Sequence, residues 1–214
     1  RARTRLKDIL KSYPDHRQAM ELLFDLDLAA GDWNHAASTL SRLRQLEGES
    51  AALLMAEGKL YESQKYFARA IAAYERAVTL EADAQDPLVA VVHLDLQNKQ
   101  PERARRRLEA IITARPNHPY AHGLMGEVLS LVGRQDSAMA HFREATRLNP
   151  TWITPWLDSA TLSISQGQAD GAIQTLREGL AANQASEELH MLLASVLANQ
   201  GQVDEAIMAY DAVL

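Results

Sequence analysis

Two histidines in the segment HPYAH have a spacing that could bind a metal ion. His118 and His122 stand four residues apart, which places both on one face of a helix. A zinc site needs three or four ligands, and the sequence shows no third ligand and no HExxH motif nearby. His118 falls in a turn before a proline, and His122 occupies a position expected to pack between helices. We therefore expect structural roles for both and predict no metal site.

A basic run and two isolated carboxylates are the next candidates for chemistry. The segment ERARRRLEA contains four arginines bracketed by two glutamates: Arg103, Arg105, Arg106 and Arg107, between Glu102 and Glu109. A solvated helix face is the expected interpretation, and an anionic partner or lipid headgroup is the alternative. Asp27 and Asp95 fall where large inward-facing residues are expected. Because a buried carboxylate needs partners, we predict that each pairs with an arginine or a backbone donor on an adjoining helix.

Two tryptophans flank the turn in TWITPW. Trp156 is expected in the core, and Trp152 lies in a turn, where it either packs across the turn or forms part of a binding hot spot. Packing is the preferred interpretation. The sequence contains no GxxxxGK[ST], GxSxG or zinc helix motif, and no GxGxxG after a strand. We therefore predict no enzyme and no cofactor.

The whole chain follows a strict repeat. Alanines recur every 34 residues without insertion, at Ala2, Ala36, Ala70, Ala104, Ala138, Ala172 and Ala206. Four residues after each stands a large apolar residue, such as Leu40, Tyr74 or Phe142. This spacing places the recurring residues on one helical face, so each unit contains an amphipathic helix.

The other half of each unit is also helical. Asp86-Pro87 and Thr154-Pro155 indicate helix starts, with Asp86 and Thr154 expected as N-caps. Glycines close helices of this kind, at Gly31, Gly133, Gly167 and Gly201. Because no alternating β-branched segment occurs, the sequence predicts an all-α fold without a β-sheet.

The unit resembles the tetratricopeptide repeat (TPR), which is a 34-residue helix–turn–helix motif. The segment 119–152 carries this pattern most clearly, with Gly126, Ala138, Phe142, Ala145 and Pro150 at the motif positions 8, 20, 24, 27 and 32. The resemblance implies a right-handed superhelical solenoid of antiparallel helix pairs. We expect a single array 1–214: a second helix of a preceding repeat at 1–16, full repeats at 17–50, 51–84, 85–118, 119–152 and 153–186, and a final, truncated pair at 187–214.

Two repeats depart from the pattern. Position 8 holds Phe24 in 17–50 and Val92 in 85–118, and position 27 holds Leu43 and Ile111 there. Larger side chains at these positions predict wider helix separation. Repeats that depart from the pattern alternate with repeats that follow it, which indicates that a unit of two repeats was duplicated.

In the family that this chain resembles, the first helix of each repeat lines a concave groove. Carried over position by position, that groove contains Glu21, Asp25, Met55, Lys59, Glu62, Val89, His93, Tyr120, Glu127, Leu157, Thr161, Glu188, Met191 and Ser195. These residues are mildly acidic at the N-terminal end and mostly neutral later. The Lys, Asn and Arg set with which one subclass holds a C-terminal carboxylate is absent from the corresponding positions.

The resemblance implies a non-catalytic scaffold that binds a peptide or protein segment in this groove. We expect the segment to be neutral or basic, and the alternative is that the carboxylates only solvate an exposed face. A net charge of −6 argues against nucleic acid as the partner, and no apolar run is long enough to span a membrane.

Two other functions stay open. One is a regulatory or substrate-selecting arm of a larger enzyme, such as a glycosyltransferase, although its ladder of groove asparagines is not evident here. The other is a self-associating scaffold of a bacterial envelope or secretion assembly, through an uncapped C-terminal end with Ile207, Tyr210 and Leu214 on one apolar face. The chain reads as a fragment without a visible signal, so cytoplasm and bacterial periplasm both stay open.

Overall fold

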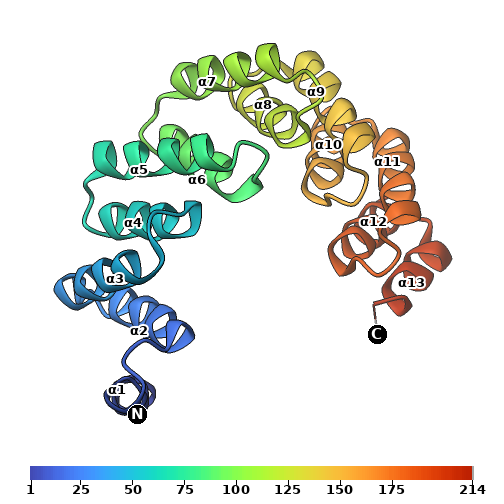
Figure 1. The fold of residues 1–214 in the computed structure, drawn as a ribbon. Helices are drawn as coiled ribbons and strands as arrows, with labels where there is room; N and C mark the ends of the chain where they lie inside the picture. Colours follow the sequence, from blue (N-terminus) through green and yellow to red (C-terminus); the bar gives the residue numbers. More distant parts are fainter. Residues whose placement is uncertain (214) are drawn as a thin grey trace. The chain divides into compact units, whose positions relative to one another are not determined.

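The computed structural model describes residues 1–213, so the expected place of Leu214 on an apolar face lies outside the described residues. Within 1–213 the chain forms helices and turns and no β-strand, which confirms the all-α prediction. The helices are α1 (Ala2–Ser12), α2 (Arg17–Ala29), α3 (Trp33–Glu47), α4 (Ala51–Ser63), α5 (Phe67–Leu80), α6 (Gln85–Gln97), α7 (Pro101–Ala114), α8 (Pro119–Leu131), α9 (Gln135–Leu148), α10 (Thr154–Ser165), α11 (Ala169–Ala182), α12 (Glu187–Asn199) and α13 (Val203–Asp211). Figure 1 shows them in chain order.

The chain divides into two compact units. Unit 1 is Arg1–Asn98 and holds α1 to α6, whereas unit 2 is Lys99–Leu214 and holds α7 to α13. Inside each unit the helices pack as successive antiparallel pairs, for example α4 with α5 and α8 with α9 (Figure 1). Each unit is described separately below.

The turn between the two helices of a pair requires a residue with a left-handed backbone conformation. Gly31 and its three predicted counterparts all have a positive φ, between 71° and 77°. Lys65 and Lys99 occupy the same register and also have a positive φ, of 63° and 57°. This conformation is strained for a residue with a Cβ atom, so the fold imposes it against local preference.

Two predicted N-caps are wrong. The N-cap of α6 is Ala84, two residues before Asp86, and the N-cap of α10 is Ile153, one residue before Thr154. Proline is tolerated inside the first turn because the N–H groups there have no intrahelical acceptor. Helix α6 therefore starts one residue before its Asp-Pro pair, and α10 starts at Thr154 itself. Asp32 does cap α3, accepting a hydrogen bond from the His35 backbone.

The two repeats with a glycine at position 8 pack their helices closely. A Cβ atom on Gly58 would overlap the Tyr74 ring, and one on Gly126 would overlap the Phe142 ring. In the pair α2–α3, Phe24 takes the glycine's place and Leu40 stands opposite, both buried in one cluster. The wider separation of this pair stays a prediction.

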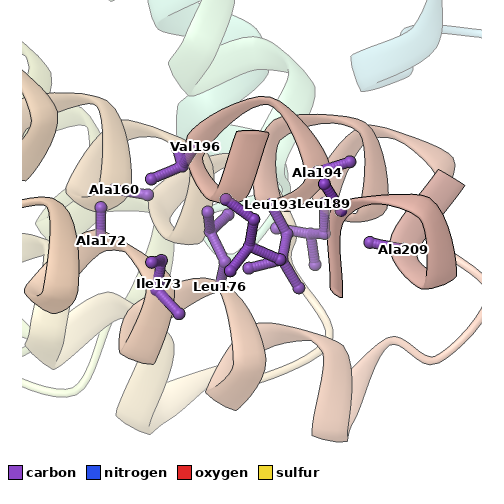
Figure 2. Packing of buried hydrophobic residues seen from close by; sticks show 11 residues of the cluster. Ala160, Ala172, Ile173, Leu176, Leu189, Leu193, Ala194, Val196 and Ala209 are labelled. Atoms are coloured by element: carbon purple, nitrogen blue, oxygen red, sulfur yellow. The ribbon is translucent and has the colours of Figure 1, made fainter. Parts of the chain in front are cut away.

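The core of unit 2 continues through its last helices. Leu176 of α11 packs with Leu189 and Leu193 of α12, and Ala209 of α13 closes the same cluster. Figure 2 shows these side chains meeting between the helices. A continuous apolar core of this kind arises because no helix pair can bury its own apolar face alone.

Asp27 forms an ion pair with an arginine of the neighbouring helix. Asp27 is fully buried in α2, and the Nε atom of Arg3 in α1 lies 2.6 Å from its Oδ1 atom. Arg3 also pairs with Asp32, and this hydrogen bond, together with that from His35, holds the pKa of Asp32 far below its usual range. The predicted arginine partner is therefore confirmed for Asp27. Asp95 of α6 is buried to the same extent.

Candidate functional site

The first helices of the pairs carry all of the predicted groove residues. We call this surface the first-helix face: α2, α4 and α6 in unit 1, and α8, α10 and α12 in unit 2. Each of the fourteen predicted side chains keeps access to solvent. Those that are exposed are Asp25, Lys59, His93, Thr161, Glu188, Met191 and Ser195, and those half-buried are Glu21, Met55, Glu62, Val89, Tyr120, Glu127 and Leu157. Their role in binding stays a prediction.

Two predicted groove carboxylates of unit 1, Glu21 and Glu62, accept hydrogen bonds from other side chains of the protein. Glu21 accepts a hydrogen bond of 2.8 Å from Nε of Arg17, one turn earlier on α2. Glu62 accepts a hydrogen bond of 2.8 Å from the Tyr74 hydroxyl, which reaches it past Gly58. Burial and this carboxylate raise the pKa of Tyr74 well above its usual range, so the phenol stays a donor. Arg17 thus offsets the charge of Glu21, whereas Glu62 keeps its negative charge, and Asp25 is the exposed carboxylate among the predicted groove residues of unit 1.

The first-helix face of unit 2 contains an aromatic pair that the sequence did not reveal. The rings of Tyr120 and Trp152 stand edge to face, with centroids 5.0 Å apart. The Trp152 indole fills the space above Gly123, where a Cβ atom would overlap the ring. Packing across the turn is confirmed, and it places Trp152 beside two groove positions. The signal that could have found it is the glycine at position 5 of this repeat, which leaves room for a large ring.

Uncharged side chains dominate the rest of this face. Leu131 at the end of α8 is 65% exposed, Ile164 at the end of α10 is 39% exposed and Met191 of α12 is 49% exposed. Helix α10 contacts both α8 and α12, so the three helices lie side by side. Glu188 accepts a hydrogen bond from Ser186, which caps α12. Exposed apolar groups on adjoining helices are typical of a surface that binds another protein.

The two candidate metal ligands have separate structural tasks. His118 is the N-cap of α8, and its Nδ1 atom accepts from the Ala121 backbone at 3.1 Å. His122 is buried, with Nε2 2.8 Å from the Pro116 carbonyl and Nδ1 3.0 Å from Nδ1 of His141. In residues 1–213 no three side chains of the types His, Cys, Asp and Glu are grouped to hold a metal ion. The arrangement is that of a shared hydrogen bond between two rings.

The basic run lies on α7, and its best-defined ion pairs are local. Arg105 bonds to Glu102 and Glu109 on the same helix. This agrees with the expected solvated face. No helix in the described range is long and apolar enough to span a membrane.

Comparison with known families decides the class of this fold. The tetratricopeptide repeat model matches residues 63–128, 132–196 and 163–214, and a second model with the same description matches residues 21–87. The chain belongs to the tetratricopeptide repeat family. TPR proteins generally mediate protein–protein interaction and are typically non-catalytic. Protein partners therefore follow from the family for this TPR chain.

Solved structures share the TPR fold with this chain. A crystal structure of MamA superposes with a TM-score of 0.57 at 16% identity, covering 73% of this chain and 91% of that chain. The thermophilic TPR protein TTC0263 of Thermus thermophilus gives a TM-score of 0.57 at 19% identity, covering 77% of this chain and 90% of that chain. At these identities the likeness concerns the fold alone. A comparison with curated proteins found no match.

Proposed function

We propose that this TPR chain is a non-catalytic scaffold that binds a peptide or protein segment on its first-helix face. The observation that supports the proposal best is the apolar, accessible surface of unit 2, where Leu131, Ile164 and Met191 stand on adjoining helices. Burying such side chains against a partner contributes about 25 cal/mol for each Å² removed from water. Tyr120 and Trp152 add aromatic surface, which is enriched in binding hot spots.

The charge of the first-helix face indicates which segments it accepts. Asp25 of unit 1 and Glu188 of unit 2 are exposed carboxylates, and Lys59 is the lysine among the predicted groove residues. A neutral or basic segment with apolar anchors complements this surface, whereas an acidic segment meets like charge. The interaction is screened by salt, because the carboxylates are exposed.

Titration with designed peptides tests the proposal. The probes are peptides of equal length with the same leucine anchors and with lysine, glutamine or glutamate between them, and the readout is chemical-shift change in backbone amides. We expect shifts in α8, α10 and α12 for the lysine and glutamine peptides, which Met191→Glu and Ile164→Glu weaken at least about tenfold. As matched control, Met208→Glu changes an exposed methionine on the second helix α13 and should leave binding within about twofold.

An acidic peptide that binds this face as tightly as the lysine peptide, with loss in Met191→Glu, would contradict the predicted charge preference. Equal binding losses in Met191→Glu and Met208→Glu would contradict the site itself.

A further inference from the structure

Unit 2 also contains a pocket that none of the predicted groove residues lines. It has a volume of about 630 Å³ and is lined by residues of α9, α10 and α11 and by Pro150. Arg143 and Arg147 line one wall, Thr175 and Glu178 line the other, and Trp156 lies at the base. A concave site with apolar and polar groups of this size is large enough for a side chain or a small organic molecule.

The next pair of second helices has a similar pocket of about 560 Å³, between α11 and α13. The two pockets are related by the repeat, so Arg177 is the counterpart of Arg143, 34 residues later. Arg177 pairs with Glu205 across the gap between the helices. Glu205 therefore neutralises the arginine of the second pocket.

The first pocket lacks this counter-charge. The residue in the register of Glu205 is Gly171, which has no side chain, and a Cβ atom there would meet the Gln168 Cβ atom at an ordinary contact distance of 3.9 Å. Arg147 is already paired with Glu144 of the same helix, to which it donates two hydrogen bonds of 2.8 and 2.6 Å. No carboxylate in the described part of the chain pairs with Arg143, so its guanidinium is an unneutralised cation at the pocket mouth.

The remaining lining groups restrict the ligand. Glu178 already accepts a hydrogen bond of 2.9 Å from Gln174, and its charge opposes a second negative group at that wall. The Trp156 indole donates to the Pro150 carbonyl at 3.0 Å, so its ring offers a fixed apolar surface. The lining thus favours a single negative charge at Arg143 with an uncharged stem over Trp156. A planar carboxylate suits a guanidinium best, because two parallel hydrogen bonds can form.

We infer that this pocket is a second binding site, which takes a carboxylate with a short uncharged stem, held by Arg143 over Trp156. A glutamate side chain of a partner protein and a free small organic acid share this chemistry. The site is distinct from the predicted groove, since none of the fourteen predicted groove residues lines it.

A titration followed at the tryptophan indole N–H groups tests the inference. The chain has three tryptophans, so Trp156→Phe assigns the Trp156 signal. The probes are acetyl-Ala-Glu-Ala-amide, its glutamine analogue and butyrate. We expect a saturable Trp156 shift with the glutamate peptide, with the glutamine analogue at least about tenfold weaker. A shift with butyrate as well identifies small acids as ligands, and a shift with the peptide alone identifies a protein side chain.

Three variants distinguish a site from incidental charge. Arg143→Gln should weaken the glutamate peptide at least about tenfold, because the guanidinium supplies the bidentate contact. Gly171→Glu should do the same while leaving Arg143 in place, since it supplies the missing internal counter-charge at a position where a Cβ atom makes only an ordinary contact. The matched control Arg177→Gln removes an arginine that Glu205 already neutralises, and affinity should stay within about twofold.

Circular dichroism establishes that each variant keeps its helical content. The inference is overturned if no probe gives a saturable Trp156 shift. It is equally overturned if folded Gly171→Glu and Arg143→Gln bind the glutamate peptide as the parent protein does.

Discussion

In both helix pairs α2–α3 and α8–α9 a large aromatic ring packs against a smaller residue, but the ring comes from the first helix in one pair and from the second helix in the other. In α8–α9 the first helix offers Gly126 and the second supplies Phe142, whereas in α2–α3 the first helix supplies Phe24 and the second offers Leu40. The large ring thus moves from one helix to the other. The comparison teaches that the repeat fixes where helices meet, while the complementary volumes at that meeting point are set pair by pair.

Replacing the aromatic ring by alanine should be the most destabilising of these substitutions in both pairs. Phe24→Ala and Phe142→Ala each delete a buried ring, and we expect each to lower the free energy of unfolding by about 3–5 kcal/mol. Urea unfolding followed by circular dichroism measures the loss. A loss below about 1 kcal/mol in one pair alone would show that the two rings are not equivalent, since truncation of an exposed side chain costs that little.

Adding a single methyl group should separate the two pairs. Gly126→Ala places a Cβ atom against the Phe142 ring, and we expect a loss of about 1–3 kcal/mol although alanine favours a helix. The triple variant Gly126→Phe, Phe142→Leu, Ala145→Leu copies the α2–α3 set of Phe24, Leu40 and Leu43 into α8–α9. If it unfolds at lower urea concentration than Gly126→Ala, complementary volume is not the explanation, and the backbone separation of each pair is fixed elsewhere.

Acid should weaken α8–α9 more than α2–α3. His141 faces His122 in the first pair, whereas Thr39 and Met20 occupy these registers in the second. Burial and the neighbouring ring lower the pKa of His141 below 6.5, against the opposing effect of Glu144. The unfolded chain therefore binds a proton more readily, and this contribution to stability is lost as pH falls below about 6.5.

Urea midpoints between about pH 7.5 and about pH 5 measure this effect, and His141→Gln should reduce the slope with pH. An unchanged slope in His141→Gln would assign the acid sensitivity to other groups. The exposed His35, which bonds to Asp32 in unit 1, provides the matched control as His35→Gln.

The smallest predicted effect is that of Gly171→Ala, which should stabilise the protein, whereas Gly126→Ala should destabilise it. Gly171 lies in α11, and a Cβ atom there would make only an ordinary contact of 3.9 Å with the Gln168 Cβ atom. Gly171→Ala should therefore stabilise the protein by about 0.5–1 kcal/mol through helix propensity alone. Thermal unfolding beside Gly126→Ala measures the contrast, and a loss of stability in both variants would show that backbone entropy is not what distinguishes the two sites.

Much of the fold was predictable because the repeat is free of insertions. The alanine ladder and the glycine turns correctly indicated the helices and the turns between them. The wrong N-caps at Asp86 and Thr154 show the limit of local signals, since proline inside a first turn looks like a helix start. Lys65 and Lys99 gave no local sign of a left-handed turn, because tertiary packing imposes it.

Side-chain pairs between helices were beyond the reach of the sequence. The contact of His122 with His141, and that of Trp152 with Gly123, depend on which faces meet and at what distance. The missing counter-charge of Arg143 became readable only when residues of α9 and α11 were seen to line one pocket. Which segment the first-helix face binds depends on a partner surface, and no property of this chain alone encodes that surface.

The ring and its facing position are always 16 residues apart, as in Phe24 and Leu40, Gly58 and Tyr74, or Gly126 and Phe142. This spacing constrains how such a gene can recombine. A crossover in the loop between two pairs transfers both members together and yields a viable hybrid. A crossover in the turn inside a pair would place Phe24 opposite a tyrosine, so that the two rings overlap. It would also place a glycine opposite a leucine, which leaves a cavity in the core. Recombination between helix pairs is therefore expected to preserve the core, whereas recombination inside a pair is expected to disrupt it.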